Sequence, residues 1–285
     1  MILVTGGTGM LGRDVVASLE AAGIEAQLAD RSKFDLTDPR GVYDYVAGAG
    51  VSVVIHLAAE TNVDLCERDP RRAGVANHLA TEAIALAAQQ AGAYLIYIST
   101  SNVFGTEGRF SYNELDLPGS LNYYGKSKLM GENAVRSLLP SRSLIIRPGW
   151  MIGGGPEHDH KFVGRMIGQI RSGAETLSAV SDKYGSITYA KRLAEFIVWA
   201  VQIQHTGLVH FASTGAVSRL QIAEAIGLFF GFPGTLNGVS SSEYPLSAPR
   251  PQSEALVSIY MPTHLGSPGP NDWRTDLQDY LEVFK

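Results

Sequence analysis

The chain has 285 residues, of which 45% are hydrophobic and 18% are charged, and it contains 31 glycines. This length and balance exclude a fibrous or disordered protein and predict a globular α/β protein with a sizeable core. The 28 acidic residues outnumber the 23 Lys and Arg residues, both signs are scattered along the chain, and we therefore expect no nucleic-acid partner.

Cysteine usage and the pattern of apolar runs indicate the compartment. Cys66 is the single cysteine, so no intramolecular disulfide can form, and no Cys/His cluster has the spacing of a structural zinc site. The apolar start of the chain leads directly into glycines without a basic leader, and no apolar run reaches the roughly 18 residues that span a bilayer. We therefore expect a cytoplasmic protein without a membrane anchor.

Short apolar runs alternate with helical patterns in the first 150 residues, which predicts βαβ units and a doubly wound parallel sheet. The strand runs lack polar alternation, as expected where helices cover both faces of a sheet. The predicted strands are Ile2–Thr5, Glu25–Ala29, Val51–Ala59, Tyr94–Thr100 and Leu144–Arg147. The predicted helices between them are Leu11–Ala22, Arg71–Ala91 and Tyr124–Leu139.

The composition of the sequence changes after Trp150, where three glycines and a proline precede a polar loop. We place a boundary there, with a core of residues 1–150 and a smaller lobe of residues 151–285. Residues 161–172 and 190–203 have helical patterns and Leu208–Phe211 has that of a strand. We expect these later elements to return partly to the sheet and partly to form a small cap.

A glycine-rich turn follows the first predicted strand, with glycines at positions 6, 9 and 12. Gly6 permits a tight turn, Gly9 lets backbone N–H groups approach a pyrophosphate, and Gly12 allows close packing of helix on strand. The N-terminus of the helix, at Met10 and Leu11, adds the positive end of its dipole. The spacing predicts a dinucleotide-binding site.

The choice of dinucleotide depends on the residues after the second predicted strand. Asp30 lies where a carboxylate accepts hydrogen bonds from an adenosine ribose, whereas the adjacent Arg31 suits a 2′-phosphate. Both NAD and NADP therefore remain candidates, and Asp30 can also be read as a solvated turn residue. Asp35 can be read as a cap for the helix that follows Pro39.

A candidate catalytic group comes from Tyr124 and Lys128, which share one helix face at a spacing of four residues. A nearby ammonium lowers the pKa of a phenol, so that the tyrosine can exchange protons near neutral pH. Ser99, Thr100 and Ser101 end the fourth predicted strand, in the crevice where such sheets bind ligands. A hydroxyl there can hydrogen-bond and polarise a substrate carbonyl.

Together these motifs make the sequence resemble the extended short-chain dehydrogenases/reductases over nearly the whole chain. Within that superfamily it is most similar to the dTDP-4-dehydrorhamnose reductases and related nucleotide-sugar 4-ketoreductases. The stretches that carry the resemblance are Asp35–Asp38, His56–Asp64, Ile98–Thr100, Tyr124–Lys128, Arg147–Trp150, Lys161–Val163 and Arg250–Pro251.

The resemblance implies a Rossmann fold and an enzyme that reduces the C4 ketone of a nucleotide-activated deoxysugar with NADPH or NADH. It implies that Thr100 orients the carbonyl, that Tyr124 is the acid/base, and that Lys128 binds the nicotinamide ribose and tunes Tyr124. Cofactor contacts are further implied for Asp35, Leu36, Ala58 and Ala59. Contacts with the sugar and diphosphate are implied for Thr61, Val63, Trp150, Lys161 and Arg250.

The chain departs from the family after the strand-end threonine. Family reductases usually continue with Asp-Tyr, whereas Ser101 and Asn102 stand here, and this leaves the exact sugar open. Related dehydratases carry an Asp-Glu pair at this place, and its absence argues against elimination of water. The alternatives that remain are a nucleotide-sugar epimerase and a non-catalytic NAD(P)-binding subunit, and the oligomeric state, with a homodimer as the candidate, stays open.

Other polar residues are assigned to the scaffold. We expect no metal at His158 and His160, which flank Asp159 in a polar loop. His56 ends a buried strand and is interpreted as a core histidine with satisfied hydrogen bonds. Asn77 and Cys66 are interpreted as packed residues without their own chemistry.

Overall fold

A six-stranded parallel sheet forms the centre of the computed structural model, which describes residues 1–30 and 32–285. Each strand pairs in parallel with its neighbours, and the chain order reverses between the first and third strands. Ligands of such sheets bind where the order reverses, outside the carboxyl ends of the strands. In spatial order the strands are β11 (Gly207–Phe211), β6 (Ser143–Pro148), β4 (Tyr94–Ile98), β3 (Val53–His56), β1 (Ile2–Thr5) and β2 (Ala26–Leu28).

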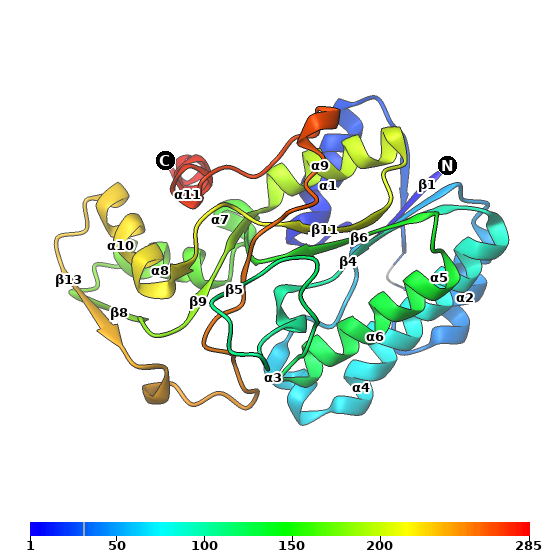
Figure 1. Ribbon diagram of the computed structural model, residues 1–285. Helices are drawn as coiled ribbons and strands as arrows, with labels where there is room; N and C mark the ends of the chain where they lie inside the picture. Colours follow the sequence, from blue (N-terminus) through cyan, green and yellow to red (C-terminus); the bar gives the residue numbers. More distant parts are fainter. Residues whose placement is uncertain (31) are drawn as a thin grey trace.

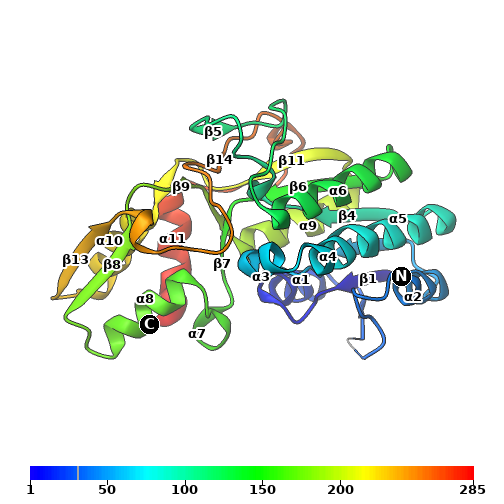
Figure 2. The ribbon, with the colours of Figure 1, turned by 90° about the horizontal axis from the view of Figure 1, so that it is seen from below.

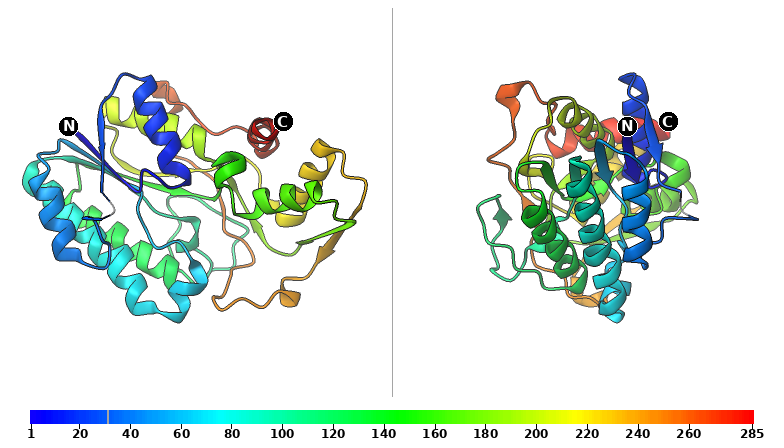
Figure 3. Two further views of the ribbon diagram at one scale, coloured as in Figure 1. Left: turned by 180° about the vertical axis from the view of Figure 1, so that it is seen from behind. Right: turned by 90° about the vertical axis from the view of Figure 1, so that its right-hand side faces the viewer.

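Helices cover both faces of this sheet, which confirms the predicted doubly wound α/β class. Helices α1 (Met10–Ala21) and α9 (Ala190–Ile203) pack together on one face. Helices α2 (Pro39–Gly48), α5 (Ala80–Ala91) and α6 (Tyr123–Leu138) cover the other face, as Figure 1 and Figure 3 show from opposite sides. The strands are buried on both sides, as their uninterrupted apolar sequences predict.

The helical pattern predicted over residues 71–91 forms a continuous but irregular element. It follows the short helix α3 (Val63–Arg68) and begins with α4 (Pro70–Gly74). A π-helical turn over Val75–Leu79 then leads into α5. Such turns often occur beside functional sites. Here the turn brings Asn77 into the molecule, where it is buried.

A second lobe with its own apolar core lies beside the sheet, and Figure 2 shows it on the side of the molecule away from α2 and α5. It has short paired strands and four helices of its own among the described residues, while α9 and β11 belong to the layers of the central sheet. Its helices are α7 (Gly155–His158), α8 (Phe162–Arg171), α10 (Arg219–Phe230) and α11 (Trp273–Leu281). The short strands, with one partner from the first half of the chain, are β5 (Ser111–Tyr112), β7 (Trp150–Ile152), β8 (Thr176–Val180), β9 (Tyr184–Gly185), β10 (Ile187–Tyr189), β12 (Val217–Ser218), β13 (Thr235–Val239) and β14 (Ala255–Leu256). One-turn 3₁₀ helices occupy Ser101–Val103, Ser241–Glu243, Thr263–Leu265 and Glu282–Phe284.

The structure corrects several predicted boundaries. The third and fourth strands end at His56 and Ile98 rather than at Ala59 and Thr100, because the chain leaves the sheet where it turns toward the ligand crevice. The polar loop after Trp150 contains α7. Among residues 1–30 and 32–285, none of the helices combines the length and apolar character needed to cross a membrane.

Candidate active site

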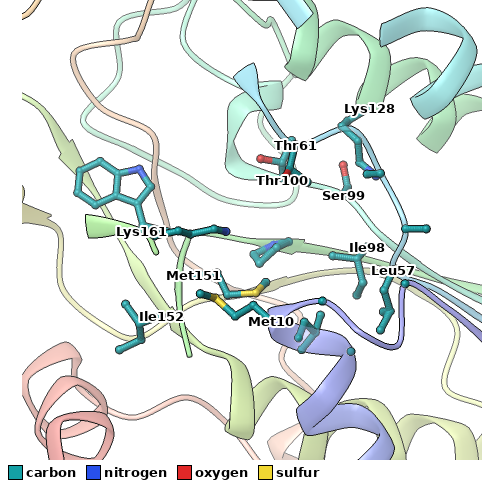
Figure 4. Close-up of a pocket in the computed structure, with 18 of the residues that line it drawn as sticks. Met10, Leu57, Thr61, Ile98, Ser99, Thr100, Lys128, Met151, Ile152 and Lys161 are labelled. Carbon is teal, nitrogen blue, oxygen red and sulfur yellow. The ribbon is translucent and has the colours of Figure 1, made fainter. Parts of the chain in front are cut away.

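One cavity of about 680 Å³ joins the carboxyl ends of the strands to the second lobe. Figure 4 shows Met10 from the start of α1, Leu57 from the end of β3, Thr100 and Lys128 across from them, and Lys161 from the lobe. Most of the predicted site residues line it together. They are Gly6, Gly9, Met10, Leu11, Gly12, Leu36, Ala58, Ala59, Thr61, Thr100, Tyr124, Lys128, Trp150 and Lys161.

The glycine turn has the backbone geometry that its spacing predicts. Gly6 has a φ of 71°, in the region that favours glycine, and a Cβ there would lie 2.8 Å from the Ala58 backbone nitrogen. A Cβ at Gly12 would lie 2.2 Å from the Gly6 carbonyl oxygen, so helix α1 packs against the turn at a distance that only glycine allows.

Gly9 stands at the N-cap of α1 without a side chain that caps the helix, which leaves backbone N–H groups directed at the cavity. Anions bind readily at such an uncapped terminus. The turn therefore fits the diphosphate of a dinucleotide.

Asp30 and Asp35, the carboxylates expected near the adenosine, both accept hydrogen bonds from residues of their own turns. Asp30 Oδ1 accepts hydrogen bonds from the backbone and the hydroxyl of Ser32, which lower the pKa of Asp30. Asp35 Oδ1 is held in the same way by Thr37, and the side chain that caps α2 is Asp38, not Asp35. Among the described residues that line the cavity, neither Asp30 nor Asp35 is present. The remaining candidate here, Arg31, falls outside the described residues.

The candidate catalytic groups come from the end of β4 and the start of α6. Asn122 caps α6 by accepting a hydrogen bond from the Gly125 backbone, so the first turn that carries Tyr124 is fixed. Thr100 lies two residues beyond β4, where its hydroxyl accepts a hydrogen bond from the Asn102 backbone at 3.2 Å. Thr100, Tyr124 and Lys128 are all buried and all line the cavity.

The predicted lowering of the Tyr124 pKa by Lys128 is wrong for this structure. Burial raises the pKa of Tyr124 to about 12, and a hydrogen bond with Thr100 opposes this only in part. Burial also lowers the pKa of Lys128 to about 7, and its ammonium lies 4.2 Å from the centre of the Tyr97 ring. Desolvation outweighs the Thr100 hydrogen bond for Tyr124 and the attraction of Glu132 for Lys128. The phenol of Tyr124 consequently holds its proton at neutral pH.

A buried hydrogen-bond network holds the strand end beneath these groups. The Ser99 hydroxyl donates to Glu132 Oε1 at 2.6 Å, and Arg147 donates to both oxygens of the same carboxylate at 2.8 and 2.7 Å. These contacts lower the pKa of Glu132, although its burial alone would raise it. Ser99 thus serves the scaffold, which leaves Thr100 as the strand-end hydroxyl available to a ligand.

Asn77 connects the loop after β3 to helix α6. Its amide accepts from the Glu60 backbone nitrogen at 2.8 Å and donates to the Glu60 carbonyl at 3.0 Å and to the Ser127 hydroxyl at 3.1 Å. Ser127 lies between Tyr124 and Lys128 on the chain. The interpretation of Asn77 as structural is therefore correct, and the structure adds that it ties two walls of the cavity together.

The lobe wall contains functional candidates that the motifs did not indicate. Arg219 lines the cavity with its guanidinium 3.8 Å from the centre of the Trp150 ring. Glu254 is buried behind that wall and accepts hydrogen bonds from Trp150 Nε1 at 2.8 Å, Asn102 Nδ2 at 2.6 Å and Ser101 Oγ at 2.7 Å. Ser101 and Asn102 are the two residues that depart from the family pattern. No spacing rule links them to position 254.

Two residues that were predicted to contact the substrate, Val63 and Arg250, do not line the cavity. Arg250 donates to Asp64 Oδ2 at 3.3 Å and to the Ala248 carbonyl at 2.9 Å. Val63 packs against the cluster of Cys66, Ala73 and Tyr124. Both residues are engaged in contacts that shape the wall rather than face the cavity.

His56 behaves as a scaffold residue, whereas His158 and His160 line the cavity. His56 lies 2.8 Å from Thr5 Oγ1 and 3.1 Å from Thr81 Oγ1, and burial lowers its pKa to about 3, so it is a neutral core histidine as interpreted. In the loop after β7, Asp159 accepts hydrogen bonds from Tyr280 and from the Gly164 backbone. The described residues contain no group of three or more His, Cys, Asp or Glu side chains arranged for a metal ion.

The family described as "RmlD substrate binding domain" matches residues 1–285. The dTDP-4-dehydrorhamnose reductase of Mycolicibacterium smegmatis is 34% identical over 281 residues, which cover 98% of this chain and 84% of the relative.

Solved structures superpose over nearly the whole chain. A crystal structure of dTDP-4-dehydrorhamnose reductase from Yersinia enterocolitica is 52% identical, with a TM-score of 0.98 and coverage of 100% of this chain and 99% of that one. The Bacillus anthracis enzyme of the same name, in complex with NADP, is 29% identical, with a TM-score of 0.90 and coverage of 99% and 98%.

Proposed function

The chain belongs to the RmlD substrate binding domain family, and from this premise we propose that it reduces the C4 ketone of dTDP-4-dehydrorhamnose, or of a closely related nucleotide-linked deoxysugar. The reductant is NADPH or NADH. The observation that carries the proposal is that one cavity brings together the glycine turn and the residues Thr100, Tyr124 and Lys128.

The cofactor is assigned to the wall formed by β1, α1 and the loop after β3. Its diphosphate is assigned to the backbone of Gly6, Gly9 and Gly12 with Met10 and Leu11, because α1 offers uncapped N–H groups there. Ala58 and Ala59 border it with small side chains, and Leu36 lines its adenine end. When bound, the nicotinamide supplies the hydride for the ketone carbon.

The proton for the alcohol oxygen is assigned to the phenol of Tyr124. Because its pKa is raised to about 12, this group holds its proton at pH 7 and donates it as negative charge develops on the ketone oxygen. The hydroxyl of Thr100 donates a hydrogen bond to the same oxygen and orients it. Lys128 is assigned to the nicotinamide ribose, where its ammonium also favours the tyrosinate formed after proton transfer.

The nucleotide sugar is assigned to the other part of the cavity, with Thr61 on the sheet side and Trp150 and Lys161 on the lobe side. This makes residues 151–285 mainly the substrate-binding lobe and residues 1–150 the cofactor-binding core. A cytoplasmic location and a homodimer complete the proposal.

Turnover of purified protein with dTDP-4-dehydrorhamnose tests the function. We expect one NADPH or NADH to be oxidised for each sugar reduced, whereas an epimerase would consume no net cofactor. Tyr124→Phe should lose turnover, and the matched control Tyr123→Phe, at an exposed neighbouring phenol, should keep it. Binding of NADPH without oxidation by any 4-keto sugar would support a non-catalytic subunit instead.

A further inference from the structure

Arg219 is the first residue of α10 and reaches the cavity from the lobe side. Its guanidinium lies over the Trp150 ring at 3.8 Å and 5.0 Å from the centre of the Phe162 ring. Contact with the faces of these two aromatic rings positions the guanidinium without using its N–H donors. The group is therefore positioned before any ligand arrives.

The donors of Arg219 have no acceptor in the part of the chain that the structure describes. No hydrogen bond or ion pair joins its guanidinium to any of residues 1–30 or 32–285, although Glu254 lies close enough to stabilise its charge. Both oxygens of Glu254 already accept from Trp150, Asn102 and Ser101. The guanidinium of Arg219 thus lines the cavity, is half-buried, and has no hydrogen-bond acceptor for its N–H donors among the described residues.

A second cation lies close to Arg219 on the same wall. Lys161 lines the cavity, and its pKa is lowered by desolvation and by the charge of Arg219. The neighbouring carboxylate, Asp159, is occupied by Tyr280 and by the backbone of Lys161 and Gly164. Two cations that repel each other in a partly closed cavity are stabilised by an anion placed between them.

We propose that Arg219 binds the diphosphate of the nucleotide-sugar substrate, with its planar fork donating to phosphate oxygens while Trp150 supports it from behind. This assignment rests on the proposed function, and it adds a binding residue from α10. Arginine forks match phosphate oxygens in a bidentate way, and such charge-assisted bonds are shorter and stronger than neutral ones. The diphosphate of the cofactor has its own place at the N-terminus of α1, so the two diphosphates occupy different walls.

Isothermal titration of the full-length protein with dTDP, thymidine and NADPH tests the proposal. Wild-type protein should bind dTDP at least about tenfold more tightly than thymidine, because thymidine lacks the phosphates. Arg219→Gln should weaken dTDP binding about 10- to 100-fold, leave thymidine binding within about twofold, and leave the Kd for NADPH unchanged. Arg165→Gln is the matched control, since this neighbouring exposed cation is absent from the described cavity lining and its loss should change dTDP binding less than about threefold.

The outcomes separate this inference from the proposed function. Wild-type affinity for dTDP in Arg219→Gln, or equal binding of dTDP and thymidine by the wild type, overturns the role of Arg219 even if the reductase is active. Loss of dTDP binding in Arg219→Gln alone supports it, even if no 4-keto sugar oxidises NADPH. Should Arg219→Gln fail to bind NADPH and so prove misfolded, Arg219→Lys takes its place. That variant keeps the charge but loses the fork, and an unchanged Kd for dTDP would refute the assignment.

Discussion

Substitution of Gly12 by alanine is the sharpest test of the glycine turn, because the structure gives the size of the clash. The added Cβ would lie 2.2 Å from the Gly6 carbonyl oxygen, 2.6 Å from Gly7 Cα and 2.7 Å from the Gly7 carbonyl carbon. Ordinary contacts are longer by about 1 Å, and all three neighbours are backbone atoms, which cannot rotate away. Helix α1 and the turn must therefore separate.

We expect two measurable consequences of this separation. Overpacking of this kind costs about 1–3 kcal/mol in the free energy of unfolding, and each kcal/mol lowers the Tm of a chain of this size by roughly 2–4 °C. Displacement of the phosphate site should cost at least one charge-assisted hydrogen bond, about 1.5–3 kcal/mol, and so raise the Kd for NADPH roughly 10- to 100-fold. Differential scanning fluorimetry and fluorescence titration of NADPH measure the two effects.

Two other glycines serve as controls that separate folding from binding. A Cβ at Gly9 meets only the Gly6 oxygen, at 3.2 Å, so Gly9→Ala should change the Tm by less than about 2 °C while its methyl group weakens NADPH binding about tenfold. A Cβ at Gly48, in α2, meets nothing within 4 Å, and Gly48→Ala should leave the Kd unchanged and raise stability by about 0.5–1 kcal/mol. Wild-type Tm and wild-type NADPH affinity in Gly12→Ala would refute the assigned role of the turn.

Three further predictions concern protons. Tyr124→Phe should lower kcat by roughly 10²- to 10⁴-fold with little change in the Kd for NADPH, and a variant with near-normal kcat would exclude Tyr124 as the proton donor. Because the pKa of Lys128 is lowered to about 7, NADPH affinity should fall as the pH rises above 7, and Lys128→Met should remove this dependence; an identical pH profile in both proteins would contradict it. The pKa of His56 is lowered to about 3, so below pH 6.5 the unfolded chain binds a proton that the folded chain does not, and the free energy of unfolding should decrease as the pH falls from 6.5 toward 3. Urea denaturation at pH 7 and 5 should show a smaller decrease for His56→Asn than for the wild type, whereas His160→Asn, at an exposed side chain, should behave as the wild type does.

The sheet could be predicted because local sequence and tertiary environment agree along it. The run Val53–Ile55 in β3 is apolar at every position, which is the pattern of a parallel strand covered on both faces, and glycines mark the turn that follows β1. The second lobe was harder to predict. Strands such as β9 and β12 have two residues each and are stabilised by pairing with each other, so their own sequences carry almost no periodicity.

The candidate site also has features that the sequence could predict and features that it could not. Gly6, Thr100, Tyr124 and Lys128 could be predicted because fixed spacings express the geometry of one turn, one strand end and one helix face. The pKa of Tyr124 could not be predicted, since a helical spacing places Lys128 near it but says nothing about how far both groups are removed from water. In the structure desolvation decides the direction of both pKa values.

Glu254 shows why a departure from a family motif can be misjudged from one segment of sequence. When their own segment is considered alone, Ser101 and Asn102 only leave the exact sugar open. In the fold they donate to a carboxylate that is more than 150 residues away along the chain, at 2.7 and 2.6 Å. The same carboxylate holds the indole nitrogen of Trp150, and Trp150 in turn supports Arg219. The identities of residues 101, 102 and 254 are therefore coupled through one buried charge, and a substitution that restores the family residue at position 102 alone would leave Glu254 with one donor fewer, at a cost of about 1–3 kcal/mol.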